Sequence, residues 1–297
     1  MGHFALKSKV KTNGFEGWYL RLSDPQKTFN VALIFAHTTN QEDPHAFIQI
    51  FDGTKKTNTY LRFDAETFRF ENDTVFIGEN HLSLTSVHLK TQVLTLDATF
   101  ENPIYNKEKS AMGILEKFPL ETFQEVVIMD GTMHGKAKVY GKDMMLDGTL
   151  YMEKTYGHKF PKTWFWVQAN HFNIPGVSLS MSGGHVPTIK VRPFGFFVLL
   201  YTSTKNYRFA TYDLSRMKIF HEAKKTRFLV KKWFKTLEVI VTQHDPTELV
   251  GPTDGGLMTL PVYESIRAHV KVTLKRGATT LLTTESPLSG FEYMMKG

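Results

Sequence analysis

Apolar and polar residues alternate along much of the chain, which is the pattern of β-strands that bury one face. The clearest example is residues 266–275, where five apolar residues alternate with five polar or charged ones. The same period of two runs through residues 92–100. Shorter runs of aromatic and β-branched residues recur about every 8–12 residues with turn signals between them, as in sandwiches and barrels. No long, capped helical pattern interrupts them, so the sequence predicts an all-β protein with antiparallel strands.

Most of the expected strands are short. They are placed at residues 17–22, 30–36, 46–51, 60–63, 67–70, 74–77, 81–89, 92–100, 177–181, 196–202, 207–212, 228–230, 237–242 and 266–275. Two further runs, 136–140 and 144–152, are expected to form a hairpin that turns at residues 141–143. Residues 120–129 fit a helix and a strand equally well, because their apolar positions satisfy both periods.

The stretch 151–172, YMEKTYGHKFPKTWFWVQANHF, is the most informative part of the chain. Its aromatic residues after the proline predict a strand, in which side chains two apart share a face. One face then holds two indoles and two amides, from Trp164, Trp166, Gln168 and Asn170. Such a mixed face suits the wall of an apolar pocket that has a few hydrogen-bonding groups. The alternative is a core strand whose amides bond to neighbouring backbone.

Two of the expected strands contain a tryptophan at or near their start. Trp18 directly follows a glycine, Trp164 follows a proline turn, and a series of short strands comes after each of them. This layout predicts two similar β-barrels packed together, an N-terminal one over residues 1–158 and a C-terminal one over residues 159–297. Small β-barrels commonly hold one apolar ligand.

Composition narrows the possible chemistry. The chain has 297 residues and no cysteine, which excludes disulfides, thiolate metal sites and cysteine nucleophiles. The histidines form no HExxH or comparable cluster, and no phosphate-binding glycine turn or GxSxG motif is present. We therefore expect no metal and no cofactor. No apolar run resembles a signal peptide or a membrane span, which predicts a cytoplasmic protein.

A net charge of +7 permits an acidic partner. Residues 224–235, KKTRFLVKKWFK, mix cations with large apolar groups, and they are compatible with peripheral contact to an anionic membrane surface. The alternative is a hairpin with one solvated basic face. Nucleic acid is not expected as a partner, because the charge is spread along the chain and no nucleic-acid-binding module is visible.

Three segments resemble the tocopherol cyclase-like family. They are FEGWYLRL at 15–22, MEKTYGHKFPKTWFWVQANHF at 152–172 and PVYESIRAHVKVTL at 261–274. This family belongs to a wider group with carotenoid hydratases and is associated with paired lipocalin-like barrels. The resemblance implies a protein that binds a prenylated aromatic or another isoprenoid. Plant members of the family close a chromanol ring, in which a prenyl alkene is protonated and the phenol oxygen attacks the cation.

Protonating an alkene requires a carboxylic acid that burial keeps neutral. Glu153 is the first candidate for this catalytic acid, and Glu16, two residues before a tryptophan, is the second. The alternative for the Glu153-Lys154 pair is an ordinary charged strand end. A buried Glu153 that faces the ligand without a neutralising partner would favour an enzyme, whereas a Glu153 paired with Lys154 or an arginine outside the pocket would favour a carrier.

Aromatic faces would stabilise the tertiary cation, and amides would hold the phenol or quinone oxygens. The expected ligand-binding residues are Trp18, Tyr156, His158, Trp164, Trp166, Gln168 and Asn170. For Trp18 the alternative is a plug that closes one end of a barrel. The chain reads Thr155-Tyr156 where relatives usually read Asp-Trp, and Gly131 stands where they often carry a histidine. Two functions therefore stay open, an isomerase acting on a prenylated ring and a non-catalytic carrier or sensor of a hydrophobic small molecule.

Overall fold

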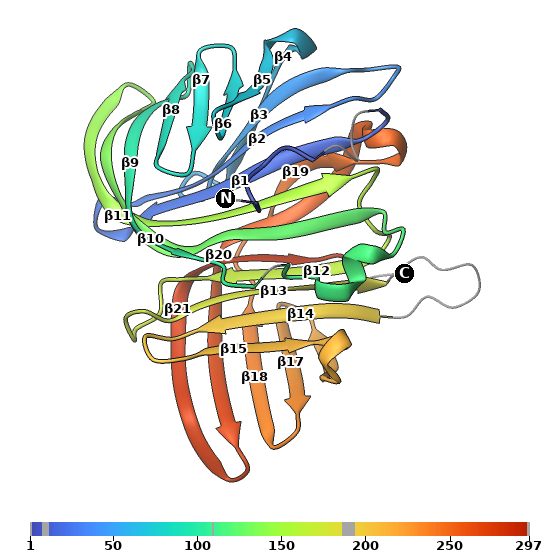
Figure 1. Cartoon of the computed structure of the whole chain (residues 1–297). Helices are drawn as coiled ribbons and strands as arrows, with labels where there is room; N and C mark the ends of the chain where they lie inside the picture. The colour runs from blue at the N-terminus through green and yellow to red at the C-terminus, as the bar shows by residue number, and fades with distance from the viewer. Residues whose placement is uncertain (1, 8–11, 109, 186–193, 296–297) are drawn as a thin grey trace. The chain divides into compact units, whose positions relative to one another are not determined.

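The computed structural model describes residues 2–7, 12–108, 110–185 and 194–295. These residues form β-strands and short 3-10 turns, and no α-helix occurs among them. The strands build two nearly closed antiparallel barrels, which confirms the predicted all-β, lipocalin-like two-barrel fold (Figure 1). Within the described ranges, no helix has the length and apolar character needed to span a bilayer.

Two compact units make up the chain. Unit 1 comprises Met1–Glu108, Glu121–Phe160 and Leu249–Pro261, and unit 2 comprises Lys109–Leu120, Pro161–Glu248 and Val262–Gly297. Each unit therefore contains more than one segment of the chain. The predicted domain boundary between residues 158 and 159 stays a prediction.

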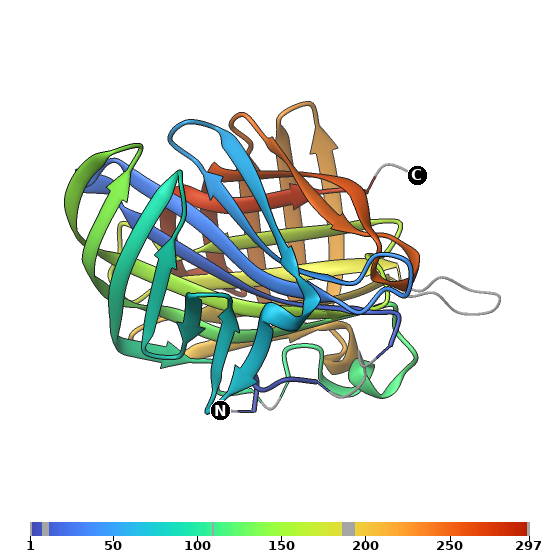
Figure 2. The same cartoon turned by 90° about the horizontal axis from the view of Figure 1, so that it is seen from above.

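Eleven strands form the first sheet, and they curve around one interior in both views (Figures 1 and 2). The sheet order is β4-β3-β2-β1-β11-β10-β9-β8-β7-β6-β5. The bounds are β1 (Phe15–Asp24), β2 (Phe29–Thr38), β3 (His45–Asp52), β4 (Thr57–Asp64), β5 (Phe68–Glu71), β6 (Thr74–Ile77), β7 (Asn80–Ser83), β8 (Ser86–Lys90), β9 (Leu94–Tyr105), β10 (Thr122–Val139) and β11 (Lys142–Gly157).

The second sheet has the order β15-β14-β13-β12-β21-β20-β18-β17-β16, and β19 pairs with β20. The bounds are β12 (Trp164–Ala169), β13 (Ser178–His185), β14 (Phe194–Tyr201), β15 (Asn206–Ala210), β16 (Arg216–Glu222), β17 (Lys225–Lys232), β18 (Lys235–Thr242), β19 (Thr247–Pro252), β20 (Met258–Arg276) and β21 (Thr279–Tyr293). The 3-10 turns are η2 (Pro25–Lys27), η3 (Ala65–Thr67), η4 (Gly113–Lys117), η5 (Thr211–Asp213) and η6 (Asp254–Gly256).

Alternation along the strands builds the core of each barrel. In unit 1 the even-numbered apolar residues of β1 and β11, such as Leu20 and Met152, are fully buried in one hydrophobic cluster. In unit 2 the odd-numbered residues of β12, such as Phe165 and Val167, belong to a second cluster. Burial of alternate residues fixes the register, because a shift by one residue would turn every apolar side chain outward.

The structure differs from the sequence prediction in a few elements. Residues 120–129, which fit either a helix or a strand, enter the long strand β10. The β10–β11 hairpin turns at Tyr140 and Gly141 and not at residues 141–143, since Val139 pairs with Lys142. Both turn residues have a positive φ, 48° and 84°, which is the geometry of a tight two-residue hairpin. The predicted strand 81–89 is divided into β7 and β8, and strands β16, β19 and β21 were not predicted.

Candidate functional site

Two rows of polar and aromatic residues cross the inner face of unit 1 where β1 begins. In one row the strand registers place His37, Glu16, Tyr156 and Phe123 beside one another, on β2, β1, β11 and β10. In the next row they place Phe35, Trp18, Lys154 and Glu125 beside one another. Trp18 and Phe35 belong to the core cluster, so both rows face the barrel interior.

An ion pair lies at the centre of these rows. The Lys154 Nζ is 3.0 Å from the Glu16 Oε1, and both side chains are fully buried. Lys154 also donates to the carbonyl oxygen of Ala5. The Glu16 carboxylate accepts the backbone N–H of Lys7, at 3.1 and 3.2 Å from its two oxygens. A charged pair is thus buried inside the barrel, where desolvation opposes both charges.

Burial shifts the two partners in opposite directions. It raises the pKa of Glu16, and the nearby charge and hydrogen bond of Lys154 only partly oppose that shift. It lowers the pKa of Lys154, and the carboxylates of Glu16 and Glu125 oppose this in turn. Both shifts favour the neutral forms, an acid beside an amine. A raised pKa is one property that a proton-donating carboxylic acid requires.

Aromatic rings surround the Lys154 ammonium. Its Nζ lies 5.5 Å from the ring centroid of Trp18 and 5.5 Å from that of Tyr156. Phe68 and Phe70 stack on Trp18 at centroid distances of 6.1 and 5.9 Å. A positive charge between aromatic faces is stabilised by the ring quadrupoles. The same walls can stabilise a carbocation of a bound molecule.

A neutral histidine completes the inner rows. Burial lowers the pKa of His37 to about 4. The ring of His37 stacks on Phe68 at a centroid distance of 3.9 Å. Its Nε2 is enclosed and has no hydrogen-bond partner among the described residues. His37 was not predicted from the sequence. The signal that identifies it is the register of β1 with β2, which places His37 opposite Glu16.

The N-terminal strap, residues 2–7, covers this end of the barrel interior. Phe4 is fully buried, and its carbonyl oxygen accepts the Trp18 Nε1–H at 2.9 Å. His3 Nδ1 and Lys7 Nζ both contact the Glu125 carboxylate, at 3.2 and 2.6 Å. Burial raises the pKa of Glu125, but the hydrogen bonds from His3 and Lys7 hold that pKa below its usual value. The strap therefore closes the site with both apolar and ionic contacts.

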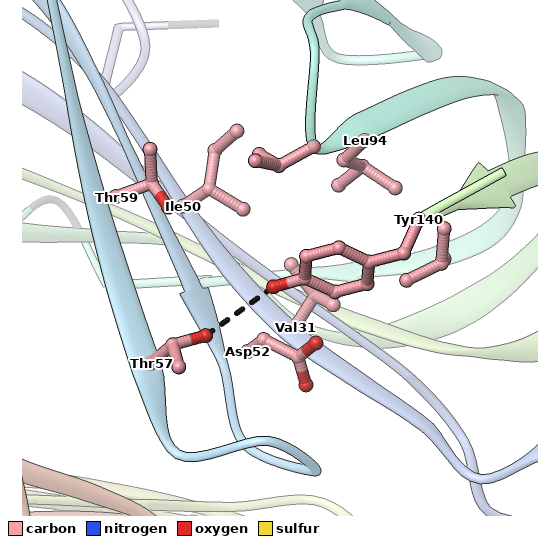
Figure 3. Close-up of a pocket in the computed structure, with 9 residues that line it drawn as sticks. Val31, Ile50, Asp52, Thr57, Thr59, Leu94 and Tyr140 are labelled. Carbon is pink, nitrogen blue, oxygen red and sulfur yellow. Dashed lines mark hydrogen bonds between the residues drawn. The ribbon is translucent and has the colours of Figure 1, made fainter.

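A small pocket lies at the other end of the same strands (Figure 3). Val31, Ile50 and Leu94 form its apolar wall, and Tyr140 lies across it with its hydroxyl 3.4 Å from the Oγ1 of Thr57. Its volume, about 10 Å³, holds about one water molecule. Val31 and His37 are six positions apart on β2, which corresponds to roughly 20 Å of strand.

Glu153, the first acid candidate, lies on the opposite face of β11 from Lys154. Its carboxylate accepts hydrogen bonds from the Tyr151 hydroxyl at 2.6 Å and from the Gln124 amide at 3.0 Å. Glu153 is buried, with an exposed fraction of 5%. Lys154 pairs with Glu16 and not with its chain neighbour. Among the described residues Lys154 therefore does not form the ion pair with Glu153 that would favour a carrier, because adjacent strand residues point to opposite faces.

The remaining predicted residues lie elsewhere. His158 follows the end of β11, and its Nδ1 is 2.9 Å from the carbonyl oxygen of Asn13. On β12 of unit 2, Trp164, Trp166 and Gln168 lie outside the core cluster of that unit, and Asn170 follows the end of the strand. All four side chains are buried. Their role in ligand binding stays a prediction.

Two hydrogen bonds involve side chains of this group. Trp164 Nε1–H donates to the Glu292 carboxylate at 2.6 Å, and the Gln168 amide donates to the Asn170 Oδ1 at 3.0 Å. The structure thus brings Glu16, Trp18 and Tyr156 together in unit 1, whereas Trp164, Trp166, Gln168 and Asn170 belong to unit 2. In the described part of the chain, no cluster of three or more histidine or acidic side chains is arranged to hold a metal ion.

The comparisons with known proteins agree with the two-barrel fold. The family model described as tocopherol cyclase-like matches residues 98–293. A candidate AttH from Nitrosomonas europaea has a similar solved structure, with a TM-score of 0.61, 13% identity and coverage of 97% of this chain and 94% of that chain. Kievitone hydratase from Nectria haematococca has a TM-score of 0.55, 13% identity and coverage of 97% and 92%. No curated protein matches the chain.

Proposed function

The chain belongs to the tocopherol cyclase-like family, and on this premise we propose that it binds a prenylated aromatic or another isoprenoid inside the barrel of unit 1. We further propose that it protonates the prenyl alkene with Glu16 and closes a chromanol-type ring. The observation that supports this most is the buried Glu16–Lys154 pair among the rings of Trp18 and Tyr156. It combines a proton source with aromatic faces in an apolar interior.

The proposed reaction needs no co-reactant. The Glu16–Lys154 pair holds one exchangeable proton, which burial allows to reside on the carboxyl group. Glu16 transfers it to the less substituted alkene carbon, and the tertiary cation forms between the rings. The phenol oxygen then forms a bond to this cation, and the phenol proton passes to the Glu16 carboxylate. Substrate and product have the same composition, so the enzyme would be an isomerase.

Hydration is a related outcome of the same first step. The structural neighbour named kievitone hydratase is, by its name, an enzyme that adds water. Ring closure and hydration of an alkene can both begin with protonation, and they differ in whether a phenol oxygen or water meets the cation. The free Nε2 of His37, beside Glu16 in the strand register, could orient either oxygen. This supports a general acid at Glu16 without deciding which nucleophile follows.

The chain of the ligand would extend along the barrel from Glu16 towards the Tyr140 pocket. Because that pocket holds about one water molecule, apolar core side chains must move to admit a long chain. The strap is the element that can uncover the site, since Phe4 closes the interior above Trp18. A long prenyl chain partitions into lipid bilayers, so we propose that the protein acquires its ligand at a membrane surface on the cytoplasmic side.

A specific observation supports the second candidate, a non-catalytic carrier. Glu16 contacts the Lys154 ammonium at 3.0 Å, and a carboxylate that remains ionised in such a pair cannot donate a proton. In that case the pair would bind the oxygens of a quinone or phenol and would orient it without turnover. Both candidates use the same interior, and they differ only in the protonation state of Glu16.

The test combines ligand identification with ring closure. The protein is purified from its own host and extracted with organic solvent, and bound lipid is identified by mass spectrometry. Wild type, Glu16→Gln and Glu153→Gln are then incubated with a prenylated hydroquinone, and the product is followed by chromatography. The proposal expects closure by wild type and a decrease of at least about 100-fold in Glu16→Gln, as for loss of a general acid. Glu153→Gln, a matched loss of a buried carboxylate on the other face, should keep most of the activity.

Other outcomes identify the alternatives. A bound isoprenoid without turnover supports the carrier, and a fatty acid or phospholipid in the extract contradicts the isoprenoid assignment. If Glu153→Gln loses closure and Glu16→Gln does not, the acid is Glu153 and the unit 1 interior is not the site of catalysis.

A further inference from the structure

The turn between β17 and β18 carries two exposed aromatic side chains. Lys232 pairs with Lys235, so Trp233 and Phe234 form a two-residue hairpin loop. Their exposed fractions are 78% and 79%, the highest of any large apolar side chain in the described chain. Exposed tryptophan is costly in water and concentrates at protein and membrane interfaces. The tip therefore resembles a contact surface more than an ordinary turn.

Turn geometry does not explain the tryptophan. Trp233 has a positive φ of 52°, a region that bulky residues rarely occupy and that glycine occupies at little cost. The neighbouring hairpin between β20 and β21 has Gly277 at its turn, with φ 58°. The two turns are in contact, because the Gly277 N–H donates to the Phe234 carbonyl oxygen at 2.8 Å. Figure 1 shows both hairpin ends side by side at the same end of unit 2.

Cations surround this tip, and their arrangement does not stabilise the pairing of the strands. Lys235 lies directly opposite Lys232 on one side and Arg276 on the other. Like charges in directly opposite positions destabilise a sheet. Asp213 neutralises Lys232 at 2.6 Å, but neither Lys235 nor Arg276 forms an ion pair with a described residue. An anionic partner would relieve this repulsion.

Two more cations extend the same edge. Lys231 and Lys275 are exposed and lie one residue from the pairs just described. Neither forms an ion pair within the described ranges. The aromatic tip is thus bordered by cations from three strands, and the neighbouring turn is in direct contact with it.

We propose that this end of unit 2 docks on an anionic lipid bilayer, with Trp233 and Phe234 inserted at the interface and the cations on the headgroups. Tryptophan favours the interfacial region of a bilayer, and cations near an anionic surface add attraction. A protruding two-residue tip suits a deformable interface better than the regular backbone of a nucleic acid. The inference deepens the proposed uptake from a membrane, but the surface stands on contacts that are independent of Glu16.

Intrinsic fluorescence tests the docking without any ligand. Trp18, Trp164 and Trp166 have exposed fractions of 0%, 8% and 5%, so Trp233 is the tryptophan that lipid can reach. With vesicles of phosphatidylcholine and phosphatidylserine, the emission should shift to shorter wavelength, and brominated lipid should quench it. Trp233→Gly should lose the shift and the quenching. Its thermal midpoint should be no lower than that of wild type, because glycine suits the positive φ.

Two matched double variants show whether vesicle binding depends on the position of the cations or only on the net charge of the protein. Lys235→Gln with Arg276→Gln should weaken vesicle binding about tenfold or more in sedimentation, since each cation near the surface contributes to the attraction. Lys224→Gln with Lys225→Gln removes the same charge from the other end of β17 and should change binding less than about threefold. Equal losses in the two variants would contradict the docking surface.

The remaining outcomes are decisive as well. No binding of wild type to these vesicles overturns the proposal, and so does binding that Trp233→Gly leaves unchanged. Tighter binding to a DNA or RNA oligonucleotide than to vesicles, lost in the Lys235→Gln and Arg276→Gln variant, would assign the surface to nucleic acid instead. Ligand binding is measured separately with detergent-solubilised isoprenoid, so failure of docking and failure of the proposed function give different results.

Discussion

At the scale of single residues, the buried Glu16–Lys154 pair is the least expected feature of the fold. A well-packed apolar pair of similar size is often as stable as a buried ion pair or more so, because desolvation offsets the attraction. The presence of the Glu16–Lys154 pair inside the barrel of unit 1 therefore points to a role in binding or chemistry. The aromatic rings around it are consistent with such a role.

Double substitution tests this view of the pair. Lys154→Met alone leaves Glu16 buried without its cation and should lower the free energy of unfolding by about 3–5 kcal/mol. Combining it with Glu16→Gln should recover most of that loss, and the measurement is urea denaturation of all four combinations. Independent, additive effects of the two substitutions would show that the pair is not coupled.

His37 gives the interior a dependence on pH. Burial lowers its pKa in the folded state to about 4, whereas the unfolded chain has the ordinary value near 6.5. As the pH falls, the unfolded state therefore binds the proton first. The stability contributed by neutral His37 is present above about pH 6.5 and is lost as the pH falls towards about 4.

The variant His37→Phe should show this directly. Phenylalanine keeps the stacking on Phe68 and does not titrate. Between about pH 6.5 and 4 the free energy of unfolding should fall more steeply in wild type than in the variant, as measured by denaturation at a series of pH values. Parallel curves for the two proteins would assign the acid sensitivity to other groups.

At the scale of elements, β1 and β11 decide what lies inside unit 1. Both strands alternate strictly, so the charged residues Glu16 and Lys154 take inner positions at the ends of otherwise apolar rows. Alternation also separates Glu153 from Lys154, although the two are adjacent in the chain. The sequence alone can therefore identify a catalytic acid on a strand only if it is known whether the odd- or the even-numbered residues of that strand face the interior.

The N-terminal strap is a second element with a testable role. Phe4→Ala removes a fully buried ring that packs on Trp18 and Phe70, at centroid distances of 5.9 and 6.0 Å. It should lower the free energy of unfolding by up to about 3–5 kcal/mol and shift part of the tryptophan emission to longer wavelength. Leu6→Ala, on the same strap but 43% exposed, should cost less than about 0.5 kcal/mol. Similar costs for the two variants would show that the strap does not close the barrel.

At the scale of the whole molecule, the net charge of +7 should govern long-range association. Binding to vesicles that contain phosphatidylserine should weaken as the salt concentration rises, because screening shortens the range of the attraction. Binding through Trp233 and Phe234 is apolar and should persist in part at high salt. Sedimentation at increasing sodium chloride measures both contributions, and binding that does not respond to salt would contradict the electrostatic one.

The sequence by itself determined the class of fold. Period-two alternation, frequent turns and the lack of long helical patterns predict an all-β chain. The quoted segments at 152–172 and 261–274 lie within the residues 98–293 that the family model matches. It also placed Glu16, Trp18 and Tyr156 among the candidates. These conclusions depend on local patterns, which can be recognised within the residues of a single strand.

Only the tertiary structure decided which residues meet. Lys154, Glu125 and His37 join Glu16 through the registers of β1 with β2 and β11 and of β11 with β10, and the strap adds Phe4 from outside the sheet. The Trp233 tip likewise acquires Arg276 and Lys275 from a different hairpin. Pairing between distant strands is set by burial of whole faces and by turn geometry, so one strand read alone cannot specify its partners.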